Sequence, residues 1–312
     1  MLKKKDPKIY DLVPFCRFYY FSYMKNLILI LLIVPLSSLG QYVKKSILSE
    51  SIIFDHKHVT GKVFQHDFDS EILNNSRKIF VWIPEGYDLS EEKYPLLLVH
   101  DGGSVFINRK GAFGNGNKSK NDSILEKRGW NLDETVYELI QSKKIKPIIM
   151  VGISNTKNRE LEYVPTRNGI NYGNALIQEL IPEIKKLYRI NSDDIGSLGS
   201  SAGGTISLYL GWERNDVFTK AACLSPGIIF RGQNYFELLK KARVPANLKL
   251  AMVNGSDNFD SGLQSGLDKC IDYLNKINFP KENLLYWVDK NGNHGSRSWS
   301  HQAKDIILWM YQ

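Results

Sequence analysis

The sequence predicts an α/β fold with a mostly parallel central sheet and helices on both faces. Two observations predict it: short apolar segments alternate with segments of helical period, and no internal repeat or Pro/Ser-rich linker divides the chain. The 312 residues are 43% hydrophobic and 24% charged, which is enough apolar material for a large core and excludes a disordered or fibrous protein.

The expected strands are short apolar or β-branched runs bounded by Gly, Pro, Asn or Asp. They cover residues 78–83, 96–100, 148–153, 220–224, 248–254 and 284–288. The expected helices have apolar residues at spacings of three and four. They cover residues 132–142, 173–188, 204–213, 260–278 and 300–311.

One long irregular segment, residues 107–129, is rich in Gly, Asn and Lys. It is longer than ordinary connections between helices and strands. We therefore expect either a disordered excursion or a lid over a site, mobile when no ligand is bound.

The N-terminal region has the pattern of a signal peptide. Lys25 precedes the apolar run 27–36, and small residues follow up to Gly40. The run is shorter than the roughly 20 residues that span a bilayer, so we expect cleavage after Gly40, a mature chain beginning at Gln41, and no lasting membrane anchor. An uncleaved anchor is the alternative, because residues 1–23 make the segment before the run unusually long. Met24 is therefore the expected true start.

The charge pattern argues against a nucleic-acid partner. The net charge is +8, but beyond residue 40 only 35 basic residues face 31 acidic ones, and they are scattered without a basic stripe.

Two cysteines, Cys223 and Cys270, remain beyond residue 40, because Cys16 lies before it. We expect them to be two buried free thiols, and a disulfide between them is the alternative.

The sequence predicts no metal site and no cofactor. The cysteines lack the spacing of metal ligands. The early histidines His56, His58 and His66 have no fixed carboxylate spacing and are expected on a surface strand.

The chemistry concentrates in the G-x-S-x-G pattern of residues 199–203. This pattern is typical of a tight turn from a strand into a helix, in which Ser201 has a strained backbone and carries the nucleophile. Side chains at Gly199 and Gly203 would collide in such a turn. The Ala202 N–H, at the start of a helix, is then placed to stabilise an oxyanion.

A serine nucleophile needs a base and an acid, each on a loop after a later strand. Asp257 follows the expected strand 248–254, and His294 follows the strand 284–288, so both are expected at the edge of the sheet where Ser201 lies. Asp260 is the rival for the acid, and His301, in the last expected helix, is the rival for the histidine.

The second oxyanion donor is expected in the loop after an early strand. The Gly103 N–H is the candidate there. His100 and Asp101, which come just before it, are expected to shape this loop rather than to transfer protons.

Several ordered motifs resemble the putative-esterase family of α/β-hydrolases, which includes enterochelin esterases, S-formylglutathione hydrolases, and feruloyl and acetyl-xylan esterases. They cover residues 77–87, 98–103, 130–134, 147–152, 159–165, 199–204 and 292–299. The resemblance extends from about residue 61 to the C-terminus. Together with the signal peptide expected over 1–40 from the N-terminal pattern, this gives an N-terminal extension over 41–60 and an α/β-hydrolase domain over 61–312.

The resemblance implies a catalytic triad of Ser201, Asp257 and His294. Relatives often carry Gln where this chain has Gly103, which makes substrate contacts the least transferable feature. Arg159 and Trp130 are the candidate substrate-binding residues, although Arg159 and Glu162 can also serve as buried ion-pair partners.

The expected function is an exported serine esterase that forms an acyl-enzyme on a carbohydrate or siderophore-type ester. Its partner is the ester substrate, with no nucleic acid. An acyltransferase of the same fold and a binding module that has lost turnover are the alternatives.

Overall fold

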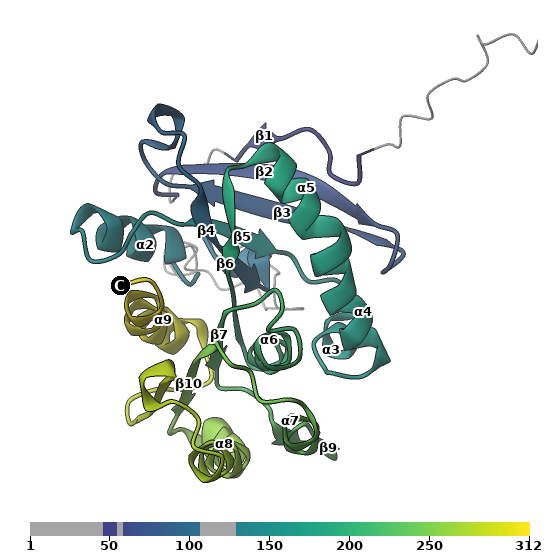
Figure 1. Ribbon diagram of the computed structural model, residues 1–312, viewed down its shortest axis with the longest axis vertical. Helices are drawn as coiled ribbons and strands as arrows, with labels where there is room; N and C mark the ends of the chain where they lie inside the picture. The colour runs from purple at the N-terminus through teal and green to yellow at the C-terminus, as the bar shows by residue number, and fades with distance from the viewer. Residues whose placement is uncertain (1–45, 55–58, 107–128) are drawn as a thin grey trace, which may run out of the picture. The chain divides into compact units, whose positions relative to one another are not determined.

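A computed structural model describes residues 46–54, 59–106 and 129–312 (Figure 1). The expected signal peptide, His56, His58 and residues 107–128 of the irregular segment lie outside the described residues. In the part that is described, no helix is long and apolar enough to span a membrane.

A nine-stranded sheet forms the centre of the fold, in the order β1-β2-β3-β5-β4-β6-β7-β10-β11. The strands from β5 to β11 in this order run parallel, and β1, β2 and β3 add antiparallel strands at one edge. The predicted α/β class with a mostly parallel sheet is therefore confirmed. The strands are β1 (Ile52–Ile53), β2 (Lys62–Ser70), β3 (Asn75–Ile83), β4 (Tyr94–His100), β5 (Ile149–Ile153), β6 (Ile190–Ser200), β7 (Lys220–Leu224), β10 (Lys249–Gly255) and β11 (Leu284–Asp289).

Helices cover both faces of the sheet (Figure 1). They are α2 (Leu132–Gln141), α3 (Arg159–Glu162), α4 (Arg167–Ala175), α5 (Ile181–Leu187), α6 (Ala202–Glu213), α7 (Phe236–Lys241), α8 (Asn258–Lys276) and α9 (Ser296–Tyr311). Short 3-10 turns occur at η2 (Tyr87–Leu89), η3 (Gly102–Ser104) and η5 (Lys281–Asn283).

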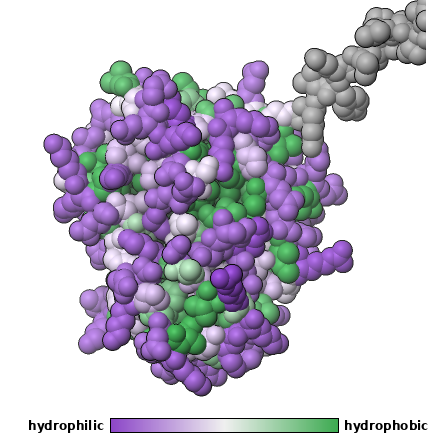
Figure 2. Space-filling model, viewed as in Figure 1, coloured by the Kyte–Doolittle hydropathy of each residue, from purple (hydrophilic) through white to green (hydrophobic). Residues whose placement is uncertain are grey.

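The core consists of three clusters of buried hydrophobic residues. The alternation of side chains along each strand explains how the residues divide among them. Side chains alternate between the two faces of a strand, so Ala251 and Val253 of β10 pack with α2 and α9, whereas Leu250 and Met252 pack with α6, α7 and α8. The third cluster joins β4 and β5 to α4 and α5. On the face drawn in Figure 2, hydrophobic residues form separate patches among polar ones.

The expected helix 173–188 is interrupted by a π turn, η4 (Leu176–Leu180), which joins α4 to α5. Pro182 lies in the first turn of α5 and has no N–H to continue the regular hydrogen-bond ladder. The missing N–H of Pro182 therefore explains why the helix widens into a π turn directly before this proline.

The two cysteines beyond residue 40 are buried free thiols, as expected. Cys223 on β7 and Cys270 on α8 belong to the same core cluster. Burial raises the pKa of Cys270 to about 12 and that of Cys223 further still, so both thiols are held in their unreactive neutral form.

Candidate active site

Ser201 lies in a strained turn between β6 and α6. Its φ is +55° and its ψ is −125°, a region that residues with a side chain rarely adopt. The turn is fastened by a hydrogen bond of 2.8 Å from the Ser201 N–H to the Leu224 carbonyl. A Cβ atom on Gly199 would lie 2.4 Å from the Gly203 carbonyl oxygen, whereas a Cβ on Gly203 would first meet the Cβ of His100 at 3.4 Å. The steric demand expected at both glycines therefore falls mainly on Gly199.

The imidazole of His294 is held by a buried carboxylate. His294 Nδ1 donates to Asp260 Oδ1 at 2.6 Å, and Asp260 has no exposed surface. Since a carboxylate only accepts, the neutral ring carries its proton on Nδ1 and leaves Nε2 free as a base. No other side chain that the structure describes bonds to Nε2.

The second oxygen of Asp260 is also fully hydrogen-bonded. It accepts from the Gly255 N–H and from the Ser225 hydroxyl, both at 3.1 Å. Ser225 follows β7 with φ +45°, and its hydroxyl in turn accepts from Trp299 Nε1 at 3.2 Å. These bonds fix the carboxylate, and nothing in the sequence pattern had indicated Ser225.

The prediction that Asp257 orients the histidine is corrected by this geometry. Asp257 is the N-cap of α8, and its carboxylate accepts from the backbone N–H groups of Asp260 at 2.8 Å and His294 at 3.0 Å. The backbone N–H of Asp260 is the main cause that lowers the pKa of Asp257. An Asp just before a helix is a typical cap, a signal that could have distinguished the two acids.

Two aromatic rings flank the imidazole. The Phe259 ring lies 4.4 Å from it between centroids, and the Trp299 ring lies 5.0 Å away at 82°. Trp299 is buried, whereas Phe259 is 46% exposed. His301, the rival histidine, is exposed on α9 and makes no hydrogen bond to the described residues.

The turn after β4 carries Gly103, the predicted second oxyanion donor. Asp101 has a left-handed backbone, with φ +59°, and the turn η3 begins at the next residue. A Cβ on Gly102 would lie 2.2 Å from the backbone of Gly152, so the turn packs directly on β5. Gly103 is half-buried, and among the described residues only Ser154 Oγ, at 3.8 Å, lies within 4 Å of an added Cβ.

Arg159 points at this turn rather than into open space. Its guanidinium binds both carboxylate oxygens of Asp101, at 2.7 and 2.8 Å, and its side chain is only 17% exposed. Glu162 forms a separate buried pair with Arg77. The predicted substrate-binding role of Arg159 is therefore replaced by the ion-pair alternative.

Trp130 is also buried, at 2% exposed, and packs on Trp299 with ring centroids 5.7 Å apart. The prediction that Trp130 touches substrate is corrected, because its ring is part of the core behind His294.

His100 and His66 are core residues. His100 bonds Tyr172 and Ser197, and burial, assisted by the nearby arginines, lowers the pKa of His100 to about 3. His66 on β2 is buried between Ser49 and Tyr188, which corrects its expected surface position. No group of three metal-ligating side chains occurs within the described ranges.

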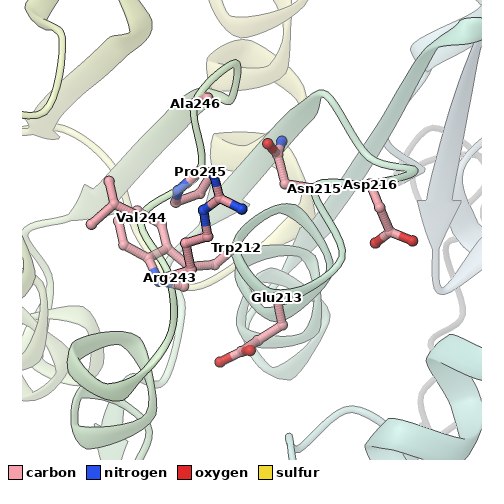
Figure 3. Close-up of a pocket in the computed structure, with 8 residues that line it drawn as sticks. All are labelled: Trp212, Glu213, Asn215, Asp216, Arg243, Val244, Pro245 and Ala246. Carbon is pink, nitrogen blue, oxygen red and sulfur yellow. The ribbon is translucent and has the colours of Figure 1, made fainter.

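A hollow of about 390 Å³ lies at the opposite end of α6 from Ser201 (Figure 3). Its lining includes Trp212, Glu213 and Arg243. Glu213 follows Ser201 by twelve residues, roughly 18 Å of helix, so this hollow is separate from the candidate site.

Residues 70–258 match the family described as Putative esterase. The chain is 19% identical over 264 residues to the uncharacterized protein YbbA of Bacillus subtilis (strain 168), covering 78% of this chain and 95% of that protein.

Solved structures of esterases share the fold. One is the enterobactin esterase FES from Shigella flexneri, crystallised in the presence of enterobactin: 18% identity, TM-score 0.62, 84% of this chain and 58% of that chain. Another is a ferulic acid esterase: 18% identity, TM-score 0.60, 80% of this chain and 98% of that chain. This chain thus spans less than two thirds of the Shigella enzyme's length. Since the family match covers well over half of the 312 residues, the chain belongs to the Putative esterase family of ester-bond hydrolases.

Proposed function

We propose that the protein is a serine esterase in which Ser201 is the nucleophile, His294 the base and Asp260 the orienting acid. The observation that carries the proposal is the 2.6 Å contact of buried Asp260 with His294 Nδ1, which places the proton of the neutral ring on Nδ1 and leaves Nε2 as the acceptor. The strained backbone of Ser201 and the start of α6 beside it support the same assignment.

In the first half-reaction, His294 Nε2 takes the proton from Ser201 Oγ while Oγ attacks the ester carbonyl carbon. The carbonyl oxygen becomes an oxyanion, which the N–H groups of Ala202 and Gly103 stabilise. The C–O bond to the alcohol then breaks, and the alcohol leaves with the proton from His294.

In the second half-reaction, water takes the place of the alcohol. His294 accepts a proton from the water as the hydroxyl attacks the acyl-enzyme, and then returns it to Ser201 as the carboxylic acid departs. Asp260 stabilises the imidazolium ion in both steps. No metal or cofactor takes part in this scheme.

The test is the pair Ser201→Ala and Ser200→Ala, measured on a small aryl ester and with a fluorophosphonate that labels active serines. Ser201→Ala should lower kcat by on the order of 10⁶ and abolish labelling. Ser200→Ala, at the end of β6, should change the rate by less than about tenfold. Full activity of Ser201→Ala would refute the proposal.

The substrate is proposed to be a carbohydrate ester or a siderophore-type ester. The likeness in fold to an enterobactin esterase and to a ferulic acid esterase supports this range of substrates. A screen over feruloyl, acetyl-sugar and siderophore esters, each at matched concentration, would identify the class by its kcat/KM.

Export is proposed from the short apolar run 27–36 and the small residues that follow it. N-terminal sequencing of protein recovered outside the cytoplasm should begin at Gln41. A sequence beginning at Met1 or Met24 would contradict cleavage at this site.

A further inference from the structure

Phe259 is an exposed aromatic residue beside the candidate base. Its ring centroid lies 4.4 Å from that of His294, and 46% of its surface is accessible. The next residue is Asp260, so the first turn of α8 carries both the carboxylate behind the imidazole and the ring beside it. The position of Phe259 is therefore tied to that of the catalytic pair.

Substrate can approach the imidazole only where the imidazole is open. Nδ1 is occupied by Asp260, and the buried Trp299 packs on the ring at 82°. Phe259 is the exposed neighbour, and the imidazole itself keeps 18% of its side-chain surface accessible. Of the two described rings that flank the imidazole, Phe259 is therefore the one that a substrate in solvent can reach.

A small hairpin extends this aromatic surface. The strands β8 (Ile229–Phe230) and β9 (Gln233–Asn234) are joined by Arg231 and Gly232, which both have positive φ as in a type I′ turn. Phe230 lies 5.8 Å from Phe259, and the Arg231 guanidinium lies 5.0 Å over the Phe230 ring. Phe230 is half-buried, whereas Phe259 is 46% exposed, so Phe259 presents the more accessible ring.

The hairpin sits tightly on the same helix. A Cβ atom on Gly266 of α8 would lie 2.9 Å from the Ile229 backbone nitrogen, so the two backbones are in close contact. The rings of Phe230 and Phe259 are therefore carried by elements that pack directly on each other. We infer that the aromatic surface they form is rigid.

We propose that Phe259 forms the subsite for the alcohol half of the ester, and that this subsite prefers alcohols carrying a flat apolar ring. This inference rests on the proposed function, in which His294 delivers a proton to the departing alcohol oxygen. The group next to the imidazole during that step is the alcohol, not the acyl chain. Ring-on-ring contact with Phe259 then stabilises a ring-bearing alcohol in preference to a straight one.

The test compares acetate esters of three alcohols of similar acidity: benzyl, cyclohexylmethyl and n-butyl acetate. Phe259→Ala should lower kcat/KM for benzyl acetate by roughly tenfold relative to both n-butyl and cyclohexylmethyl acetate, because the cyclohexyl ring is a puckered chair and not flat. An equal fall for benzyl and cyclohexylmethyl acetate would overturn the preference for a flat ring. Hydrolysis of the preformed acetyl-enzyme should be unchanged, because the alcohol has already left.

Phe64→Ala is the matched control, since Phe64 on β2 packs on Tyr188 near the far edge of the sheet, and it should not alter the ratio between esters. An equal fall for all three acetates, or a shift in the ratio of ethyl benzoate to ethyl acetate instead, would overturn the subsite. An unchanged ratio between the esters in Phe259→Ala, with activity still dependent on Ser201, refutes this inference alone, whereas activity of Ser201→Ala refutes the function itself.

Discussion

Arg159 holds both carboxylate oxygens of Asp101, with Nε 2.7 Å from Oδ1 and Nη2 2.8 Å from Oδ2. Asp101 immediately precedes the turn that carries Gly103, and its backbone N–H donates to the Tyr163 hydroxyl at 3.1 Å. Asn155 donates a third bond to the same carboxylate, at 2.9 Å. This pair therefore helps to fix the turn that carries a candidate oxyanion donor.

Replacing Arg159 by Lys should lower kcat about 10- to 100-fold with little change in KM, because a single ammonium cannot hold both oxygens. Steady-state kinetics on a small ester measures kcat and KM separately. The matched control is Arg214→Lys, since Arg214 binds Asp216 through the same two nitrogens at the end of α6. Equal losses in the two variants would show that the Asp101 pair has no particular role.

The two acids near His294 should differ sharply in their effect on rate. Asp260→Asn should cost about 10⁴ in kcat, because the imidazole loses its orienting carboxylate. Asp257→Asn retains a capping side chain and should change kcat by much less, while Asp257→Ala should lower the free energy of unfolding by about 1 kcal/mol. Side-by-side kinetics and urea unfolding check both. A large loss for Asp257→Asn alone would restore Asp257 as the acid.

Two adjacent glycines should respond differently to alanine. Gly102→Ala forces a Cβ to within 2.2 Å of the β5 backbone, so we expect a loss of about 1–3 kcal/mol in stability together with most activity. Gly103→Ala has room for its Cβ and keeps its N–H, so activity should stay within about tenfold. Thermal unfolding and esterase assays on both variants test this, and an intact Gly102→Ala would contradict the close packing of the turn.

The buried His100 should make folding pH-dependent. Burial lowers the pKa of His100 to about 3, whereas the unfolded chain protonates it near 6.5, so the stabilisation is full above pH 6.5 and is lost as the pH falls toward 3. The expected loss from this group is roughly 1.4 kcal/mol per pH unit over that interval.

Urea unfolding of the wild type and of His100→Asn between pH 7.5 and pH 4.5 measures this loss. The difference in stability between the two proteins should be constant above pH 7 and shrink below pH 6. Parallel curves would show that His100 is protonated as easily in the folded state as in the unfolded one.

The predicted strands were all found because each is a short, largely apolar run. Most of these runs are deeply buried, for example β4 and β10, while the edge strand β11 is only partly buried. The strand β2 was missed because it lies near the antiparallel edge, where polar residues such as Gln65 and Asp67 alternate with buried ones. The strand β6 was not delimited because its first half carries Asn, Ser and two Asp residues before the apolar part begins.

The order of Ser201, an acid and His294 could be read from the sequence because each follows a strand. The choice between Asp257 and Asp260 could not, since it depends on where α8 begins: at the cap, a carboxylate faces backbone N–H groups, and three residues later it faces inward. The orientation of Arg159 and the burial of Trp130 also depend on tertiary packing that local spacing does not encode.

The position of His294 near the C-terminus has a consequence for biosynthesis. Ser201 is translated 93 residues before His294, and β11, which precedes His294, is the outermost strand added to the sheet. A chain still emerging from the ribosome can build the strands around the serine before its base exists. On the proposed mechanism, a nascent chain therefore cannot hydrolyse an ester until His294 has been synthesised and has folded against Asp260.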